Sequence, residues 1–262
     1  MTKQPMIGAA LVGLLMMPMA AVAAPVVFFG EDLGAGEFVR LDATPNADAA
    51  RGSFQGKIVQ GAMESFESFQ PGTFAWTHDP IANSWTPGLA LPFTASIGGA
   101  GPIGGTISAA TGTVIEVPHG TNNFGRYPTD GDKLFHSKAD PITFEFDRPV
   151  YAFGLDIIDA GDFGGEVSIS TYAGETLLHT FAIAHVLNGD GGNVFFWGLV
   201  DAANPFTKIA ISMSTVGGDT IGLDRLLVGT VVTPIPAALP LMAAGIVALG
   251  WMRRRQAVRA SA

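Results

Sequence analysis

The segment ITFEFDRPVYAFGLDII, residues 142–158, carries the pattern that decides the fold. Apolar and polar side chains alternate over residues 143–147, and Pro149 then breaks the run. After the proline the apolar face consists of Tyr151, Phe153, Leu155 and Ile157, and the opposite face of Ala152, Gly154 and Asp156. A period of two is typical of strands that are buried on one face. The segment therefore predicts two consecutive β-strands.

The same alternation continues toward the C-terminus. We expect further strands over residues 166–171, 177–184, 194–199, 208–214 and 223–228. Glycine-containing turns separate them, at 164–165, 173–174, 188–192 and 217–219. Short strands at this spacing, without a sustained helical period, predict an all-β fold, namely an antiparallel β-sandwich of the jelly-roll kind.

The composition removes several classes of protein. The 262 residues include no cysteine, which excludes a disulfide framework, a thiolate metal site and a cysteine nucleophile. A formal net charge of −9 argues against nucleic acid as a partner. The 34 glycines follow no three-residue period, so they indicate turns and not a collagen helix.

The N-terminus has the layout of a secretory signal peptide. Lys3 precedes an apolar run that ends in small residues. Ala21 and Ala23 fit the small-x-small cleavage site, so signal peptidase would cut before Ala24 and remove residues 1–23. An uncleaved membrane anchor is the alternative, and the short apolar core, which contains Pro18, argues against it.

A second apolar stretch, residues 237–252, lies near the C-terminus and precedes an arginine cluster. Its 16 residues would span about 24 Å as a helix, which is the short limit for a bilayer. We predict one transmembrane helix here, with the arginines on the cytoplasmic side. A buried globular helix is the alternative, but no acidic residue follows Asp224 to give it a polar face.

Residues 233–241, TPIPAALPL, together with the apolar span and the arginines, resemble a PEP-CTERM protein-sorting domain in its VPLPA-type variant. The resemblance assigns sorting and processing to Pro234, Ile235, Pro236, Ala237, Arg253, Arg254 and Arg255. Thr233 replaces the expected valine and no glutamate separates the prolines. These departures leave open which processing enzyme acts on the motif.

The sorting-domain resemblance also implies a location and partners. The chain would come from a Gram-negative bacterium that makes extracellular polysaccharide. It would be exported, anchored in the inner membrane by the C-terminal helix, and processed by an exosortase-type enzyme. It would then reach the outer envelope, the cell surface or the extracellular matrix.

Between the two termini we expect one exposed domain. Residues 24–60 are an N-terminal extension or additional strands, residues 61–229 form the β-sandwich ectodomain, and residues 230–262 the sorting signal. All 23 acidic residues lie between the terminal segments with only nine of the 14 basic residues, a net charge of −14. Segments at 142–165, 196–199 and 218–224 resemble the lectin-like jelly-roll ectodomains of proteins with this sorting tail.

Two groups of carboxylates are candidate calcium sites, since calcium binds six to eight oxygen atoms. The first group follows a strand and contains Asp156, Asp159, Asp162 and Glu166, which a solvated hairpin loop would also explain. The second would join the first and last strands through Glu64, Glu67 and Asp224. Asp224 lies in an apolar strand, where an unpaired charge is costly. Arg225, Arg148 or water are its alternative partners.

Motifs for catalysis are few. The five histidines have no ligand spacing, and no H-E-x-x-H or G-x-S-x-G motif occurs. Two carboxylates that are distant in sequence could still form a glycosidase site. Trp76 and Trp85, in a region rich in proline and glycine, are candidates for stacking on sugar rings, although most aromatic residues of a sandwich fill its core.

These observations favour an exported envelope protein with a non-enzymatic structural or adhesive role, associated with exopolysaccharide or a biofilm matrix. Two alternatives stay open: a carbohydrate-binding module with structural calcium, and an extracellular glycoside hydrolase.

Overall fold

The computed structural model describes residues 23–72, 89–91, 93, 95–97, 103–109, 112–138, 141–214, 219–231, 245–247 and 251. Ala23–Thr233 form one compact unit, and Met1–Val22 with Pro234–Ala262 form a second one. Of the second unit only residues 245–247 and 251 are described, and they are helical. No helix among the described residues is long and apolar enough to cross a membrane. The rest of the predicted transmembrane helix, 237–252, lies outside them.

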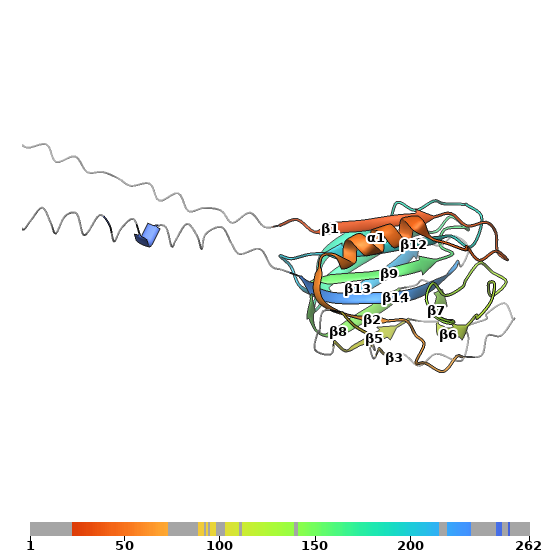
Figure 1. Ribbon diagram of the computed structural model, residues 1–262, viewed down its shortest axis with the longest axis horizontal. Coiled ribbons are helices and arrows are strands. Elements are labelled where there is room, and N and C mark those ends of the chain that lie inside the picture. The colour runs from red at the N-terminus through yellow and green to blue at the C-terminus, as the bar shows by residue number, and fades with distance from the viewer. Residues whose placement is uncertain are drawn as a thin grey trace, which may run out of the picture. The chain divides into compact units, whose positions relative to one another are not determined.

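The first unit contains two antiparallel sheets (Figure 1). In the larger sheet, six strands follow one another in the order β1 (Val26–Asp32), β12 (Val194–Val200), β9 (Ala152–Ile158), β14 (Thr220–Val231), β2 (Ile58–Glu64) and β4 (Ala95–Ile97). Two more strands extend it at β14, namely β7 (Lys133–Lys138) and, beside it, β6 (Thr113–Glu116).

The smaller sheet has, among the described residues, the order β11 (Thr176–Ala182), β10 (Glu166–Ala173), β13 (Phe206–Ser214), β8 (Ile142–Val150), β5 (Gly105–Ser108) and β3 (Leu89–Leu91). Every strand predicted after residue 142 is present, as β8 to β14. The prediction of an antiparallel all-β sandwich is therefore confirmed, whereas its finer jelly-roll assignment stays a prediction.

Pro149 does not end its strand, contrary to the sequence-based expectation. It lies inside β8, where pairing with β13 passes from Glu145 directly to Val150. Because proline has no N–H to donate to a neighbouring strand, it fits a stretch that the β13 ladder skips.

The main core lies between the two sheets and follows the predicted alternation. Phe153, Leu155 and Ile157 of β9 are fully buried in it. The Phe153 ring lies 5.4 Å from the ring of Phe144 in β8, measured between centroids. Both hydrophobic clusters lie within Ala23–Thr233. This unit therefore has a hydrophobic core of its own.

One helix, α1 (Pro45–Gln55), covers the outer face of the larger sheet over β1, β12 and β9 (Figure 1). Pro45 occupies its first turn, where a missing N–H costs nothing. Asp32 of β1 accepts hydrogen bonds from the backbone N–H groups of Asn46 (3.2 Å) and Ala47 (2.9 Å). A carboxylate at this end also complements the helix dipole. No helix was predicted here.

The α1 helix packs closely because two glycines face each other beneath it. Gly154 of β9 and Gly198 of β12 are direct partners in the sheet. A Cβ atom on Gly198 would lie 2.8 Å from Cδ2 of Phe54, the buried phenylalanine of α1. The absence of side chains at this pair lets the Phe54 ring lie against the sheet, 5.5 Å from the Phe196 ring.

The first and last strands of the unit meet at one end of the sandwich. Val26 pairs with Val200, Val200 with Ala152, and Ala152 with Gly229. The chain therefore enters β1 and leaves β14 at the same end. Loops lie at the opposite end, which is hereafter the loop end: residues 33–39, 121–126, 159–165 and 186–193.

Candidate functional site

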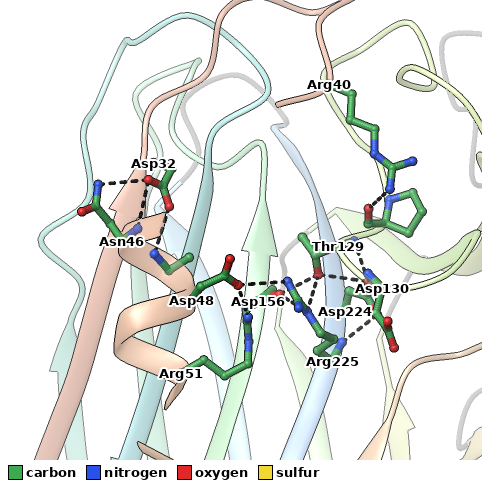
Figure 2. A network of polar contacts seen from close by, with 12 residues as sticks. Asp32, Arg40, Asn46, Asp48, Arg51, Thr129, Asp130, Asp156, Asp224 and Arg225 are labelled. Carbon is green, nitrogen blue, oxygen red and sulfur yellow. Dashed lines mark hydrogen bonds and ion pairs between the residues drawn. The ribbon is translucent and has the colours of Figure 1, made fainter. Parts of the chain in front are cut away.

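Two fully buried aspartates face each other on the outer face of the larger sheet (Figure 2). Asp156 of β9 pairs directly with Asp224 of β14. Alternation places Asp156 on the side opposite Leu155 and Ile157, so it points away from the main core and toward α1. Two carboxyl groups without solvent require nearby donors or a proton.

A β-bulge in β14 supplies one of these donors. Pairing passes from Asp224–Asp156 to Leu227–Gly154, so two residues of β14 stand opposite one residue of β9. Arg225 has a φ of +46°, in the left-handed region, which costs about 1–3 kcal/mol. The bulge turns the Arg225 side chain to the outer face, where its Nε donates to Asp156 Oδ2 at 2.8 Å.

A second guanidinium group reaches Asp156 from α1. Arg51 Nη2 donates to Asp156 Oδ1 at 2.5 Å, and its Nη1 forms an ion pair with Asp48 at 2.5 Å. The Arg51 side chain is 7% exposed. Both oxygens of Asp156 are therefore held by cations, and α1 is tied to the centre of the sheet.

Thr129 joins the two aspartates. Its hydroxyl donates to Asp156 Oδ2 at 2.6 Å and lies 3.1 Å from Asp224 Oδ2. The backbone N–H groups of Thr129 and Asp130 donate to Asp224 Oδ2 at 2.7 and 2.8 Å. Burial is the largest cause that raises the pKa of Asp224, to about 8, and the negative charge of Asp156 is the second. The backbone N–H donors lower this pKa, but by less. This shift favours the protonated form of Asp224, which relieves repulsion between the two groups.

A polar pocket of about 250 Å³ opens above this network, and we name it the Arg40/Arg225 pocket. Its lining residues are Arg40, Leu41, Asp42, Ala43, Thr44, Asp48, Tyr127, Pro128, Thr129 and Arg225. Arg225 and Thr129 belong both to this wall and to the buried network. The pocket therefore combines guanidinium donors, carboxylate acceptors and a hydroxyl, and the network holds Asp48, Thr129 and Arg225 among them.

The opposite wall of the pocket is equally constrained. The Arg40 guanidinium lies over the Tyr127 ring, 5.5 Å from its centroid, and donates to the Pro128 carbonyl at 2.8 Å. The Tyr127 hydroxyl donates to the Gly192 carbonyl at 2.9 Å and accepts from the Leu41 N–H at 3.3 Å. Both side chains thus have few rotamers to lose when a ligand binds.

The structure divides the first predicted calcium group. Asp156 belongs to the network above, whereas Asp159 lies at the loop end, ion-paired with Arg126 at 2.8 Å. Asp162 is half-buried nearby, and Glu166 is exposed in β10. Burial raises the pKa of Asp159 to about 7, although Arg126 lowers it.

A further aspartate, Asp219, joins the loop end without having been predicted. It is 2% exposed, and its Oδ2 accepts the Gly161 N–H at 3.1 Å. Burial, followed by the charge of Asp162, raises the pKa of Asp219 to about 7.

The second predicted calcium group is also divided. Both oxygens of the buried Glu64 accept backbone N–H groups, from Phe66 at 2.7 Å and Phe93 at 3.1 Å. The exposed Glu67 accepts the N–H groups of Asp132 and Lys133. Neither carboxylate shares these donors with Asp224. Over the part of the chain that the structure describes, no three acidic or histidine side chains are arranged to hold a metal ion. Calcium binding stays a prediction.

Several predicted residues lie outside the described part of the chain. These are Ala21, Trp76, Trp85, Pro234, Ile235, Pro236, Ala237, Arg253, Arg254 and Arg255. Ala23 and Ala24 are described and lie exposed just before β1.

Arg225 was named from the sequence only as a possible partner of Asp224, and no pocket was predicted around it. One signal did exist, because the adjacent Asp224 and Arg225 interrupt the apolar alternation of the last strand. Two neighbouring polar residues in such a strand indicate a bulge.

No protein-family profile matches the chain, and no curated protein is detectably similar to it in sequence. Among solved structures, the K2 cleaved adhesin domain of Lys-gingipain is similar with a TM-score of 0.37 and 11% identity, covering 65% of this chain and 98% of that domain. A family 29 carbohydrate-binding module is similar with a TM-score of 0.29 and 16% identity, over 66% and 95% of the two chains. At these values neither likeness indicates a ligand for this chain.

Proposed function

We propose that this chain is an exported, non-enzymatic β-sandwich protein that binds a saccharide in the Arg40/Arg225 pocket. Through this binding it would serve a structural or adhesive role in an extracellular polysaccharide matrix. The observation that carries the proposal is a polar pocket in which Asp48, Thr129 and Arg225 are held by a buried ion network.

The chemistry of the pocket suits a sugar ring. A saccharide presents several hydroxyl groups, each of which donates and accepts hydrogen bonds. Arg40 and Arg225 offer donors, Asp42 and Asp48 offer acceptors, and about 250 Å³ accommodates a small polar ligand. Rigid walls favour affinity because little side-chain freedom is lost on binding.

The two buried aspartates do not form a glycosidase pair. A glycosidase needs two carboxyl groups that reach the substrate from opposite sides of the scissile bond. Asp156 and Asp224 are both 0% exposed and bonded to Arg51, Arg225 and Thr129. They hold the wall of the pocket and do not face a ligand.

Export rests on the sequence features of the two termini. The boundaries of the compact unit support it, because Ala23 adjoins the predicted signal-peptide cleavage site and Thr233 is the first residue of the sorting motif. Deletion of Pro234 to Ala262 should release the domain unprocessed into the medium. If the shortened protein stays bound to the envelope, the C-terminal segment does not sort it.

The saccharide proposal is tested with residues 24–233 on an array of bacterial polysaccharide fragments. Arg40→Gln and Asp42→Asn should each weaken binding about tenfold or more, since each removes one partner from the pocket. Lys57→Gln is the matched control, because Lys57 is exposed and does not line the pocket. Equal loss with Lys57→Gln, or release of reducing ends from a bound glycan, would contradict the proposal.

A further inference from the structure

Exposed apolar side chains gather at the loop end, away from the entry and exit of the chain. Leu33 is 60% exposed, Phe38 74% and Phe163 61%. Others in the same loops are Val39, Phe124, Val186 and Leu187. Single exposed apolar residues are ordinary, whereas a group on one end of a domain marks an interaction surface.

A pocket of about 190 Å³ lies among these loops. Its lining residues are Leu33, Gly34, Ala160, Asp162, Val186, Gly189, Asp190 and Asn193. The wall thus has two carboxylates, Asp162 and Asp190, and none of the described residues that line it is basic. Glu31 stands behind the wall, where it accepts the Asn193 Nδ2–H at 2.9 Å and the Val186 N–H at 3.0 Å.

The loops that form this acidic pocket interlock through their backbones. The Gly36 N–H donates to the Gly191 carbonyl at 2.9 Å, and the Asn188 N–H to the Gly161 carbonyl at 2.7 Å. A Cβ atom on Gly34 would lie 2.2 Å from the Gly191 carbonyl oxygen, so only glycine permits this approach. The pocket therefore exists before a ligand binds, which reduces the entropy lost on association.

From this arrangement we propose that the acidic pocket receives a lysine or arginine side chain of a protein partner. The cationic head would meet Asp162 and Asp190, and its aliphatic stem would lie along Leu33 and Val186. Apolar residues beside that cation in the partner would cover Phe163 and Leu187, which are exposed. This surface is separate from the Arg40/Arg225 pocket, and the inference does not depend on saccharide binding.

Charge and polarity together select this occupant. An anionic chain would be repelled by Asp162, Asp190 and Glu31, which have no lysine or arginine among the pocket residues to offset them. A neutral sugar would leave the apolar side chains of the loop end in water. A basic segment with flanking apolar residues complements both features.

The test uses fluorescently labelled heptapeptides and residues 24–233. The peptides share one sequence of alanine and leucine around a central position that is lysine, arginine, norleucine or glutamate. We expect the lysine and arginine peptides to bind at least about tenfold more tightly than the norleucine peptide. The glutamate peptide should not bind. Equal affinity for the lysine and norleucine peptides would overturn the inference, and this comparison needs no variant.

Variants locate the binding. Asp190→Asn and Asp162→Asn should each weaken the lysine peptide by about tenfold and leave the norleucine peptide unchanged. Glu175→Gln is the matched control, because it removes the same charge from the β10–β11 turn at the opposite end. If Glu175→Gln weakens the lysine peptide by a similar factor, the peptide is attracted only by the net charge of the domain and not by the acidic pocket. If a glucosamine oligomer binds more tightly than any peptide, the partner is a cationic polysaccharide and not a protein. Either result overturns the inference.

Discussion

Asp156 and Asp224 are direct partners across two central strands, and the Thr129 hydroxyl contacts one oxygen of each. This contact links three parts of the chain that are far apart in sequence. The bulge at Arg225 and the α1 residue Arg51 both direct their guanidinium groups to the same carboxylate. The loop that follows Tyr127, the helix and the last strand therefore share one electrostatic centre beneath the Arg40/Arg225 pocket.

Arg51→Met should lower the free energy of unfolding by about 3–5 kcal/mol, because it leaves the buried Asp156 without one of its two cations. Urea denaturation of residues 24–233 measures the change. Asp48→Asn is the control: Asp48 bonds the same Arg51 but its side chain is 53% exposed, so the loss should stay below about 1 kcal/mol. Equal losses would show that burial does not determine how much each ion pair contributes to the free energy of unfolding.

The contribution of Asp224 and Asp159 to stability should fall as the pH rises from about 4 to about 8. Burial raises the pKa of Asp224 to about 8 and of Asp159 to about 7, from 3.8. Between these values the folded chain binds protons that the unfolded chain has lost, so folding is favoured at the lower pH. Melting temperatures across this range give the trend. An Asp224 resonance that titrates near pH 4 in the folded state would contradict it.

Asp219→Asn should raise the melting temperature at pH 8. The Asp219 carboxyl is only 2% exposed, and the charge of Asp162 opposes its ionisation. An amide keeps the acceptor for Gly161 and removes the repulsion. Asp159→Asn is the comparison and should lower the melting temperature, because it leaves Arg126 without its buried carboxylate. Destabilisation by both variants would refute the unfavourable role of Asp219.

Gly198→Ala should lower the free energy of unfolding by about 1–3 kcal/mol, because its Cβ would collide with the Phe54 and Phe196 rings. Gly52 lies in the exposed part of α1, where an added Cβ atom would meet no atom within 4 Å. Gly52→Ala should therefore raise the free energy of unfolding, by about 1 kcal/mol at most. Guanidinium denaturation of both variants separates the two effects. A neutral Gly198→Ala would mean that α1 does not rest on the glycine pair.

The strands could be predicted from the sequence because their alternation is local. Helix α1 could not, since its buried positions are Ala47, Arg51 and Phe54, and a charged residue interrupts the apolar stripe that identifies a helix. The orientation of Asp156 away from Leu155 followed from the alternation. Its partner did not, because Arg51 lies 105 positions away in the sequence.

The shared entry and exit of the chain has a mechanical consequence. A pull between a ligand at the loop end and the last residue of β14 acts along a strand of 12 residues. The hydrogen bonds of β14 to β9 and β2 lie across that direction, so they resist sliding together and do not open one by one. A pull on the two chain ends of the unit would instead peel β1 from β12 one bond at a time. The domain therefore resists tension best along the line from its loops to its C-terminal exit.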